Sequence, residues 1–84
     1  MRVAYLYFMT DEPQRIATVA PAHAAYWRDQ APPGYAGVPF ADRSGGLIIF
    51  DTPDRERAEQ LVAADPFVRQ DLLANRWIKE WTPE

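Results

Sequence analysis

The segment Leu47-Ile48-Ile49-Phe50 is apolar at every position, and it constrains the fold of this chain more than any other segment. It directly follows the turn sequence Asp42-Arg43-Ser44-Gly45-Gly46, and a short apolar segment after such a turn is typical of a strand. Neighbouring side chains on a strand point to opposite faces of the sheet. A strand that is apolar on both sides therefore predicts a sheet with both faces covered.

Periodicity and turn residues divide the chain of 84 residues into strand, helix, strand, strand, helix and strand, in that order. The expected strands span residues 2–9, 35–40, 47–50 and 76–81. This order is the β-α-β-β-α-β pattern of a ferredoxin-like α+β domain, an antiparallel sheet with both helices on one face. No linker or repeat interrupts the pattern, so we expect residues 1–84 to form a single domain.

Pro21 lies inside the longer helical stretch, residues 13–30. A proline removes an amide donor and disfavours helical geometry at the preceding residue, so we expect the stretch to be broken and the main helix to begin at Pro21. His23 would then lie in the first helical turn, where the helix dipole disfavours the protonated imidazole. The second helix is expected to begin after a cap at Asp51 or Thr52, and a short helical piece covers residues 66–73.

Composition excludes several classes of function. The net charge is −3 and the basic residues are scattered, with Lys79 as the one lysine, so we expect no nucleic-acid partner. The absence of cysteine and the single histidine predict neither a disulfide framework nor a metal site, and we expect no cofactor. The apolar N-terminal segment, residues 1–9, is too short to span a bilayer and lacks a signal-peptide cleavage site. We expect a cytoplasmic protein with no membrane partner.

The apolar sheet predicts a partner. Leu47 and Ile49 point to one face of their strand, Ile48 and Phe50 to the other, and residues 2–9 are similarly apolar on both sides. Two helices cover only one face of such a sheet. The simplest cover for the other face is a second copy of the chain, which predicts a homodimer formed through the open sheet face.

His23, the single histidine, lies among alanines and aromatic residues, and Asp65 lies in a similarly apolar segment. Both are on the sheet-facing sides of helices that would pack side by side, so the two side chains could be neighbours. Such a pair would give an imidazole general acid or base supported by a carboxylate, with His23 and Asp65 as the catalytic residues. The structural alternatives are a core histidine bonded to a backbone carbonyl and an aspartate that caps the helix after Pro66 by accepting from the Phe67 or Val68 amide.

Four further residues are candidates for substrate binding. Asp42 and Ser44 lie in the glycine-rich turn, where they are first of all turn-forming residues. Tyr7 and Trp27 would help to wall a pocket beside His23, although aromatic residues at these positions are more often core or interface residues.

Five segments together carry a resemblance to a known family: Pro21-Ala22-His23, Ala36-Gly37, Pro39-Phe40 with Asp42, Ala63-Ala64-Asp65-Pro66-Phe67, and the final strand ending in Trp81. Over nearly the whole chain they resemble the YciI-like (YCII-related) proteins. The resemblance implies a ferredoxin-like fold that dimerises into an α/β barrel, and a cleft built around His23 and Asp65, with Asp42 as an addition. It also implies a small lyase or hydrolase acting on ring-cleavage or chlorinated aromatic intermediates. Ala20 stands where an arginine often precedes the histidine segment, so no particular substrate is carried over.

The leading hypothesis is therefore a homodimeric lyase or hydrolase that uses His23 and Asp65 for metal-free proton transfer on a small organic molecule. Elimination, tautomerisation and hydrolysis all remain open. The alternative is a non-catalytic dimeric module that binds a small ligand or supports another protein, with His23 as a packed core residue. A dimeric barrel monooxygenase would share the architecture, but nothing in the sequence singles out its pocket residues.

Overall fold

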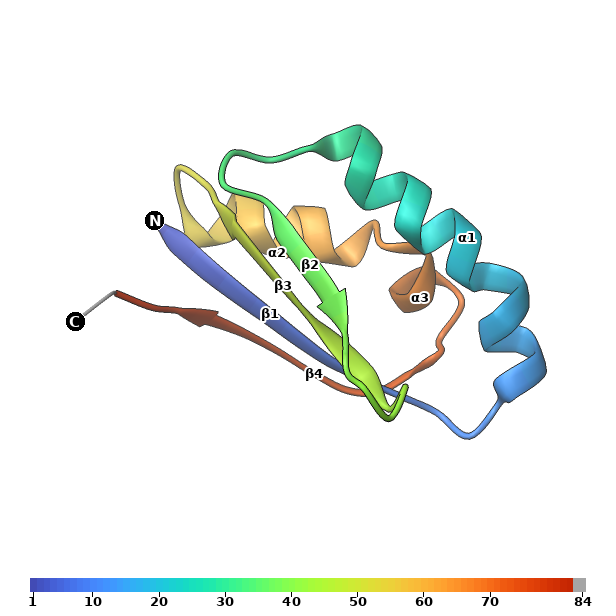
Figure 1. Ribbon diagram of the computed structural model, residues 1–84. Coiled ribbons are helices and arrows are strands. Elements are labelled where there is room, and N and C mark those ends of the chain that lie inside the picture. The colour runs from blue at the N-terminus through green and yellow to red at the C-terminus, as the bar shows by residue number, and fades with distance from the viewer. Residues whose placement is uncertain (83–84) are drawn as a thin grey trace.

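The computed structural model describes residues 1–82 and arranges four strands in one antiparallel sheet of order β2-β3-β1-β4 (Figure 1). The elements, in chain order, are β1 (Arg2–Met9), α1 (Pro13–Gln30), β2 (Ala36–Pro39), β3 (Gly45–Asp51), α2 (Arg55–Ala63), α3 (Pro66–Arg69) and β4 (Leu73–Glu80). The helices lie over one face of the sheet, as Figure 1 shows. The α+β architecture and the ferredoxin-like strand order expected from the sequence are confirmed.

The core lies between the sheet and the helices. On β1, Val3, Tyr5 and Tyr7 are buried, whereas the intervening residues are only partly covered. They face the helices together with their partners across the ladder, since Val3 pairs with Phe50 and Tyr5 with Ile48. Each large apolar side chain that leaves water on this face contributes about 1.5–3 kcal/mol to folding.

The opposite face of the sheet is apolar and uncovered in the single chain. Leu6 pairs with Leu47 on one side and with Trp77 on the other, so the three side chains share this face. Trp77 is 47 % exposed and Val38 is 63 % exposed. Both faces of the central strands are therefore apolar, as the sequence indicated, and the helices cover one of them.

The expected break at Pro21 is wrong, because α1 is continuous from Pro13 to Gln30 with Pro21 inside it. Pro13 is the proline at the first turn of the helix, where a missing amide costs nothing. Pro21 is exposed and removes a single helical hydrogen bond. Packing of α1 through the fully buried Trp27 offsets that loss.

Three boundaries also differ from expectation. Neither Asp51 nor Thr52 caps α2; the cap is Asp54, whose side chain accepts a 2.8 Å hydrogen bond from the Arg57 amide. Asp51 is instead the last residue of β3, where it pairs with Arg2. The helical piece after Asp65 ends at Arg69, and β4 begins at Leu73, earlier than expected. Within residues 1–82, no helix combines the length and the apolar character needed to cross a membrane.

Candidate active site

Asp65 lies in the connection between α2 and α3 and is completely buried. Its Oδ1 accepts a 2.9 Å hydrogen bond from the Phe67 amide, so it caps α3, and Pro66 follows in the first turn. The capping role expected for this aspartate is therefore present. It uses only part of the capacity of a carboxylate, which accepts several hydrogen bonds on its two oxygens.

His23 reaches the same carboxylate from the middle of α1. Its Nδ1 lies 2.8 Å from Oδ1 and 3.0 Å from Oδ2 of Asp65, across 42 positions of the sequence. The His23 side chain is 13 % exposed, whereas that of Asp65 is 0 % exposed. The two predicted neighbours are thus in direct contact. Because α1 begins well before His23, the argument that placed the imidazole in a first helical turn is wrong, and Asp65 is the group that orients it.

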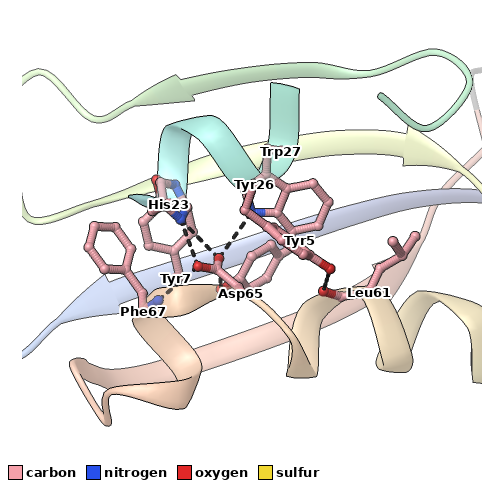
Figure 2. Close-up of polar contacts among 8 residues, drawn as sticks. All are labelled: Tyr5, Tyr7, His23, Tyr26, Trp27, Leu61, Asp65 and Phe67. Carbon is pink, nitrogen blue, oxygen red and sulfur yellow. Dashed lines mark hydrogen bonds and ion pairs between the residues drawn. The ribbon is translucent and has the colours of Figure 1, made fainter. Parts of the chain in front are cut away.

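Two more donors complete the surroundings of Asp65. The Tyr5 hydroxyl donates to Oδ2 at 3.2 Å, and the Trp27 indole Nε1 donates to the same oxygen at 3.0 Å. Figure 2 shows the carboxylate between the donors that come from β1 and from α1. Four donors on one buried carboxylate satisfy the partners that an ionised aspartate needs inside a protein. Sequence reasoning missed Tyr5, although its alternation with Tyr7 placed both on the same face of the strand.

These contacts fix which nitrogen of His23 is available for chemistry. Because Nδ1 faces the carboxylate, it carries the proton and donates it, which leaves Nε2 as the acceptor in the neutral ring. Nε2 lies 3.4 Å from the Tyr7 hydroxyl. The face of the imidazole stacks on Phe67, with ring centroids 4.2 Å apart. The imidazole is held by its edge and by one face, with Nε2 as the nitrogen that faces the Tyr7 hydroxyl.

Burial, with a smaller contribution from the negative charge of Asp65, raises the pKa of Tyr7 from 10.0 to about 12. The pKa of Tyr5 is also raised, first by burial and then by the Asp65 carboxylate. Both side chains therefore remain phenols at neutral pH. Tyr7 can donate a hydrogen bond to Nε2 or to a bound molecule, but it does not supply a phenolate base.

His23 lines a cavity of about 560 Å³. Tyr7, His23, Trp27 and Phe67 line it on the side of the Asp65 network. α1 contributes a row of small residues, Ala17, Ala20 and Ala24, and β2 contributes its backbone around Gly37 and Val38. Small side chains on the helix leave room for a ligand of about one ring, and the lining is otherwise mostly apolar.

Gly46 makes room for one wall of this cavity. It pairs with Tyr7 across the β1–β3 ladder, and a Cβ atom at position 46 would lie 2.3 Å from the Tyr7 hydroxyl oxygen. Such a contact is far below van der Waals distance, so a side chain here would displace the Tyr7 ring. The glycine was identified in the sequence only as part of a turn.

The two residues of the glycine-rich turn do not lie in the cavity lining. Asp42 Oδ1 accepts hydrogen bonds from the Ser44 amide at 3.0 Å and the Ser44 hydroxyl at 2.6 Å, and both residues are exposed. These bonds lower the pKa of the Asp42 carboxyl. Asp42 and Ser44 thus stabilise the turn, and Arg43 between them lines the cavity.

The sheet has the order β2-β3-β1-β4, and the helices on one face bring an imidazole and a buried carboxylate together beside a cavity. This arrangement defines an α+β protein of ferredoxin-like fold. The chain belongs to the YCII-related domain family, whose model matches residues 1–82. No curated protein matches it in sequence.

Among solved structures, the chain is similar to 5-chloro-2-hydroxyhydroquinone dehydrochlorinase from Burkholderia phenoliruptrix AC1100, in complex with 2,5-dihydroxybenzoquinone. The two superpose with a TM-score of 0.83 at 20% sequence identity, over 98% of this chain and 94% of the other. At this identity the likeness establishes the fold. Within residues 1–82, no group of three or more histidine or acidic side chains is placed to hold a metal ion.

Proposed function

We propose that this protein is a small lyase in which His23 transfers a proton to or from a one-ring organic substrate held in the cavity. The observation that carries the proposal is the orientation of the imidazole. Nδ1 is bound by the Asp65 carboxylate at 2.8 Å, and the same ring lines the cavity. A neutral imidazole with a supported N–H and an unprotonated Nε2 is the arrangement that a general base requires, and here a substrate would take the place of the Tyr7 hydroxyl at Nε2.

In an elimination, Nε2 takes a proton from the substrate, and the electron pair of the broken bond forms a new double bond. The leaving group departs from the neighbouring carbon with its own electron pair. The imidazolium that forms is stabilised by the buried carboxylate of Asp65, and the proton is later released to solvent or to the leaving group. Acid–base catalysis of this kind contributes roughly 10²- to 10⁴-fold to the rate.

Two observations support a lyase over the other reactions open to a histidine. The similar solved structure is that of a dehydrochlorinase, an enzyme whose reaction removes a proton and a chloride. The cavity of about 560 Å³ has ample room for a single substituted ring. Tautomerisation needs the same proton transfer without loss of a leaving group, whereas hydrolysis would need an additional activated water.

The test is a turnover assay on chlorinated hydroxyhydroquinones, read as chloride release and as the change in ring absorbance. His23→Asn and His23→Gln form a matched pair: the asparagine amide resembles Nδ1–H and the glutamine amide is placed more like Nε2, but neither is a base. Both variants should lose about 10²- to 10⁴-fold in kcat. Wild-type turnover by either variant would contradict the proposal.

A non-catalytic binding module is the second candidate, favoured by the limited access to the imidazole. His23 is 13 % exposed and its Nε2 faces the Tyr7 hydroxyl at 3.4 Å. This candidate predicts that rings bind in the cavity without turnover, and that His23→Asn changes their affinity but no rate. Chloride release above that of the variant pair excludes it.

We further propose that two copies associate through the open sheet face into a barrel-like homodimer. The exposed Trp77 and the adjacent Phe8 and Leu6 form an apolar surface that a single chain leaves in water. Sedimentation equilibrium should give twice the chain mass for the wild type, and Leu6→Lys should shift it towards the monomer. A wild-type protein that is monomeric at micromolar concentration would overturn the proposed homodimer. The cytoplasmic location stays a prediction.

A further inference from the structure

Arg43 is a cationic side chain in the cavity lining that the proposed reaction does not use. It lies in the turn between β2 and β3. Among the ion pairs described within residues 1–82, three other arginines are bound to carboxylates, and Arg43 is bound to none. Its guanidinium therefore has donors to offer to a molecule that enters the cavity.

The backbone at Arg43 adopts an uncommon conformation. Its φ of 64° lies in the left-handed region, where glycine or asparagine is the usual residue. The turn holds this conformation through the Arg43 amide, which donates to the Phe40 carbonyl at 3.0 Å, and through the Asp42–Ser44 contacts. The turn therefore carries backbone strain at Arg43, at a position where glycine would be unstrained.

The charges around the cavity favour an anion. No aspartate or glutamate within residues 1–82 lines it, and the carboxylate nearest to Arg43 in sequence, that of Asp42, is bonded to Ser44. Arg43 and His23 are the basic side chains of the described lining, in a chain whose overall charge is −3. Arg43 is an exposed residue of this lining, so its guanidinium is accessible to a ligand and can offer a charged oxygen a charge-assisted hydrogen bond.

We propose that Arg43 binds an anionic oxygen of the substrate, so that the cavity selects a flat ring carrying an acidic hydroxyl or a carboxylate over a neutral ring of the same size. The inference rests on the proposed function in assigning the cavity to a one-ring substrate. Negative charge that builds on a ring oxygen when His23 removes a carbon-bound proton would meet the same guanidinium.

The test compares two ligands that differ in charge: 2,5-dihydroxybenzoquinone, whose hydroxyls are vinylogous acids and are ionised at neutral pH, and its neutral dimethyl ether. Affinities are measured by tryptophan fluorescence quenching, with no turnover required. Arg43→Gln should weaken binding of the anion about 10- to 100-fold and leave the ether unchanged. The matched control is Arg57→Gln, which makes the same charge change on the exposed side of α2, outside the lining.

Arg43→Gly separates folding from recognition. Glycine suits the left-handed backbone, so this variant should melt at or above the temperature of the wild type and still lose the affinity for the anion. An equal loss in Arg43→Gln and Arg57→Gln, or binding of neither ring by the wild type, would overturn the inference. Failure of the proposed function would give a different result. The anion would still bind through Arg43, but His23→Asn would turn over the substrate as fast as the wild type.

Discussion

The ring of Phe67 lies nearly parallel to the imidazole of His23, with centroids 4.2 Å apart and planes inclined by 19°. Two residues earlier in the chain, the carboxylate of Asp65 binds the edge of the same imidazole. One short segment at the start of α3 therefore fixes the His23 ring in two perpendicular directions. A group held in this way needs little reorganisation before it reacts.

Phe67→Leu tests the contribution of this stacking. Leucine keeps an apolar side chain in the core but leaves the imidazole free to tilt, so kcat should fall by about one to two orders of magnitude while KM changes little. Steady-state kinetics on a substrate that the wild type turns over measures both kcat and KM. Phe40→Leu is the matched control, because the Phe40 ring lies against that of Phe8, tilted by 40°, and not on the imidazole. Equal effects of the two changes would show that the stacking has no special role.

Asp65→Asn should destabilise the fold as well as abolish activity. The amide has one acceptor oxygen for a site that receives four donors, and its own NH₂ group would face some of them. We expect the free energy of unfolding in urea to fall by about 3 kcal/mol or more. Asp54→Asn makes the same change at the exposed cap of α2, where asparagine caps equally well, and should change stability by less than about 0.5 kcal/mol.

The tautomer of His23 can be measured directly. In the neutral ring, the proton should lie on Nδ1, which faces the Asp65 carboxylate, and Nε2 should be unprotonated. Long-range ¹⁵N–¹H correlation spectra distinguish the two nitrogens, and the single histidine makes the assignment unambiguous. A neutral ring protonated on Nε2 would contradict the geometry on which the proposed base depends.

The buried phenols predict a loss of stability in alkali. The pKa of Tyr7 is raised from 10.0 to about 12, so between these pH values the unfolded chain ionises this phenol and the folded chain does not. Its contribution to stability is complete below pH 10.0 and is lost as the pH rises towards about 12. Urea unfolding measured across this range should fall more steeply for the wild type than for Tyr7→Phe, by up to about 1.4 kcal/mol per pH unit. Parallel curves would contradict the burial of Tyr7.

Gly46→Ala should disturb the wall of the cavity from the sheet side. The added methyl group would lie 2.3 Å from the Tyr7 hydroxyl and 2.6 Å from Cζ, so the Tyr7 ring must shift from its place beside His23 Nε2. Overpacking of this kind costs about 1–3 kcal/mol, and ligand affinity should fall with it. Gly37→Ala is the comparison for stability alone, because Gly37 also lines the cavity: there the nearest atoms lie at 3.0 and 3.3 Å, and a side chain can yield. A fully stable Gly46→Ala protein with unchanged binding would contradict this account.

The pairing of His23 with Asp65 could be predicted because the strand and helix order places two sheet-facing helical residues side by side. The continuity of α1 could not be predicted from the sequence. The rule that proline ends a helix describes the local chain, whereas Pro21 is exposed and the packing of Trp27 offsets the single missing bond. Helix boundaries at Asp54 and Arg69 depended on which of several polar residues reached a free amide, which spacing alone does not decide.

The parts of the site that the sequence did not reveal depend on contacts between distant segments. Tyr5 binds Asp65 from 60 positions away, and Gly46 matters only because the ladder register sets it opposite Tyr7. Asp42 and Ser44 were candidates for binding since polar side chains in turns often face ligands. The structure instead bonds them to each other and turns the intervening arginine to the cavity.

The carboxylate that orients His23 also ends a helix and anchors an indole and a phenol, so it is indispensable to folding whether or not any reaction takes place. A relative without catalytic activity would be expected to keep this aspartate and to lose the histidine first. Under the proposed function, the histidine is the residue that separates active from inactive members of this family, and the aspartate reports only that the domain is intact.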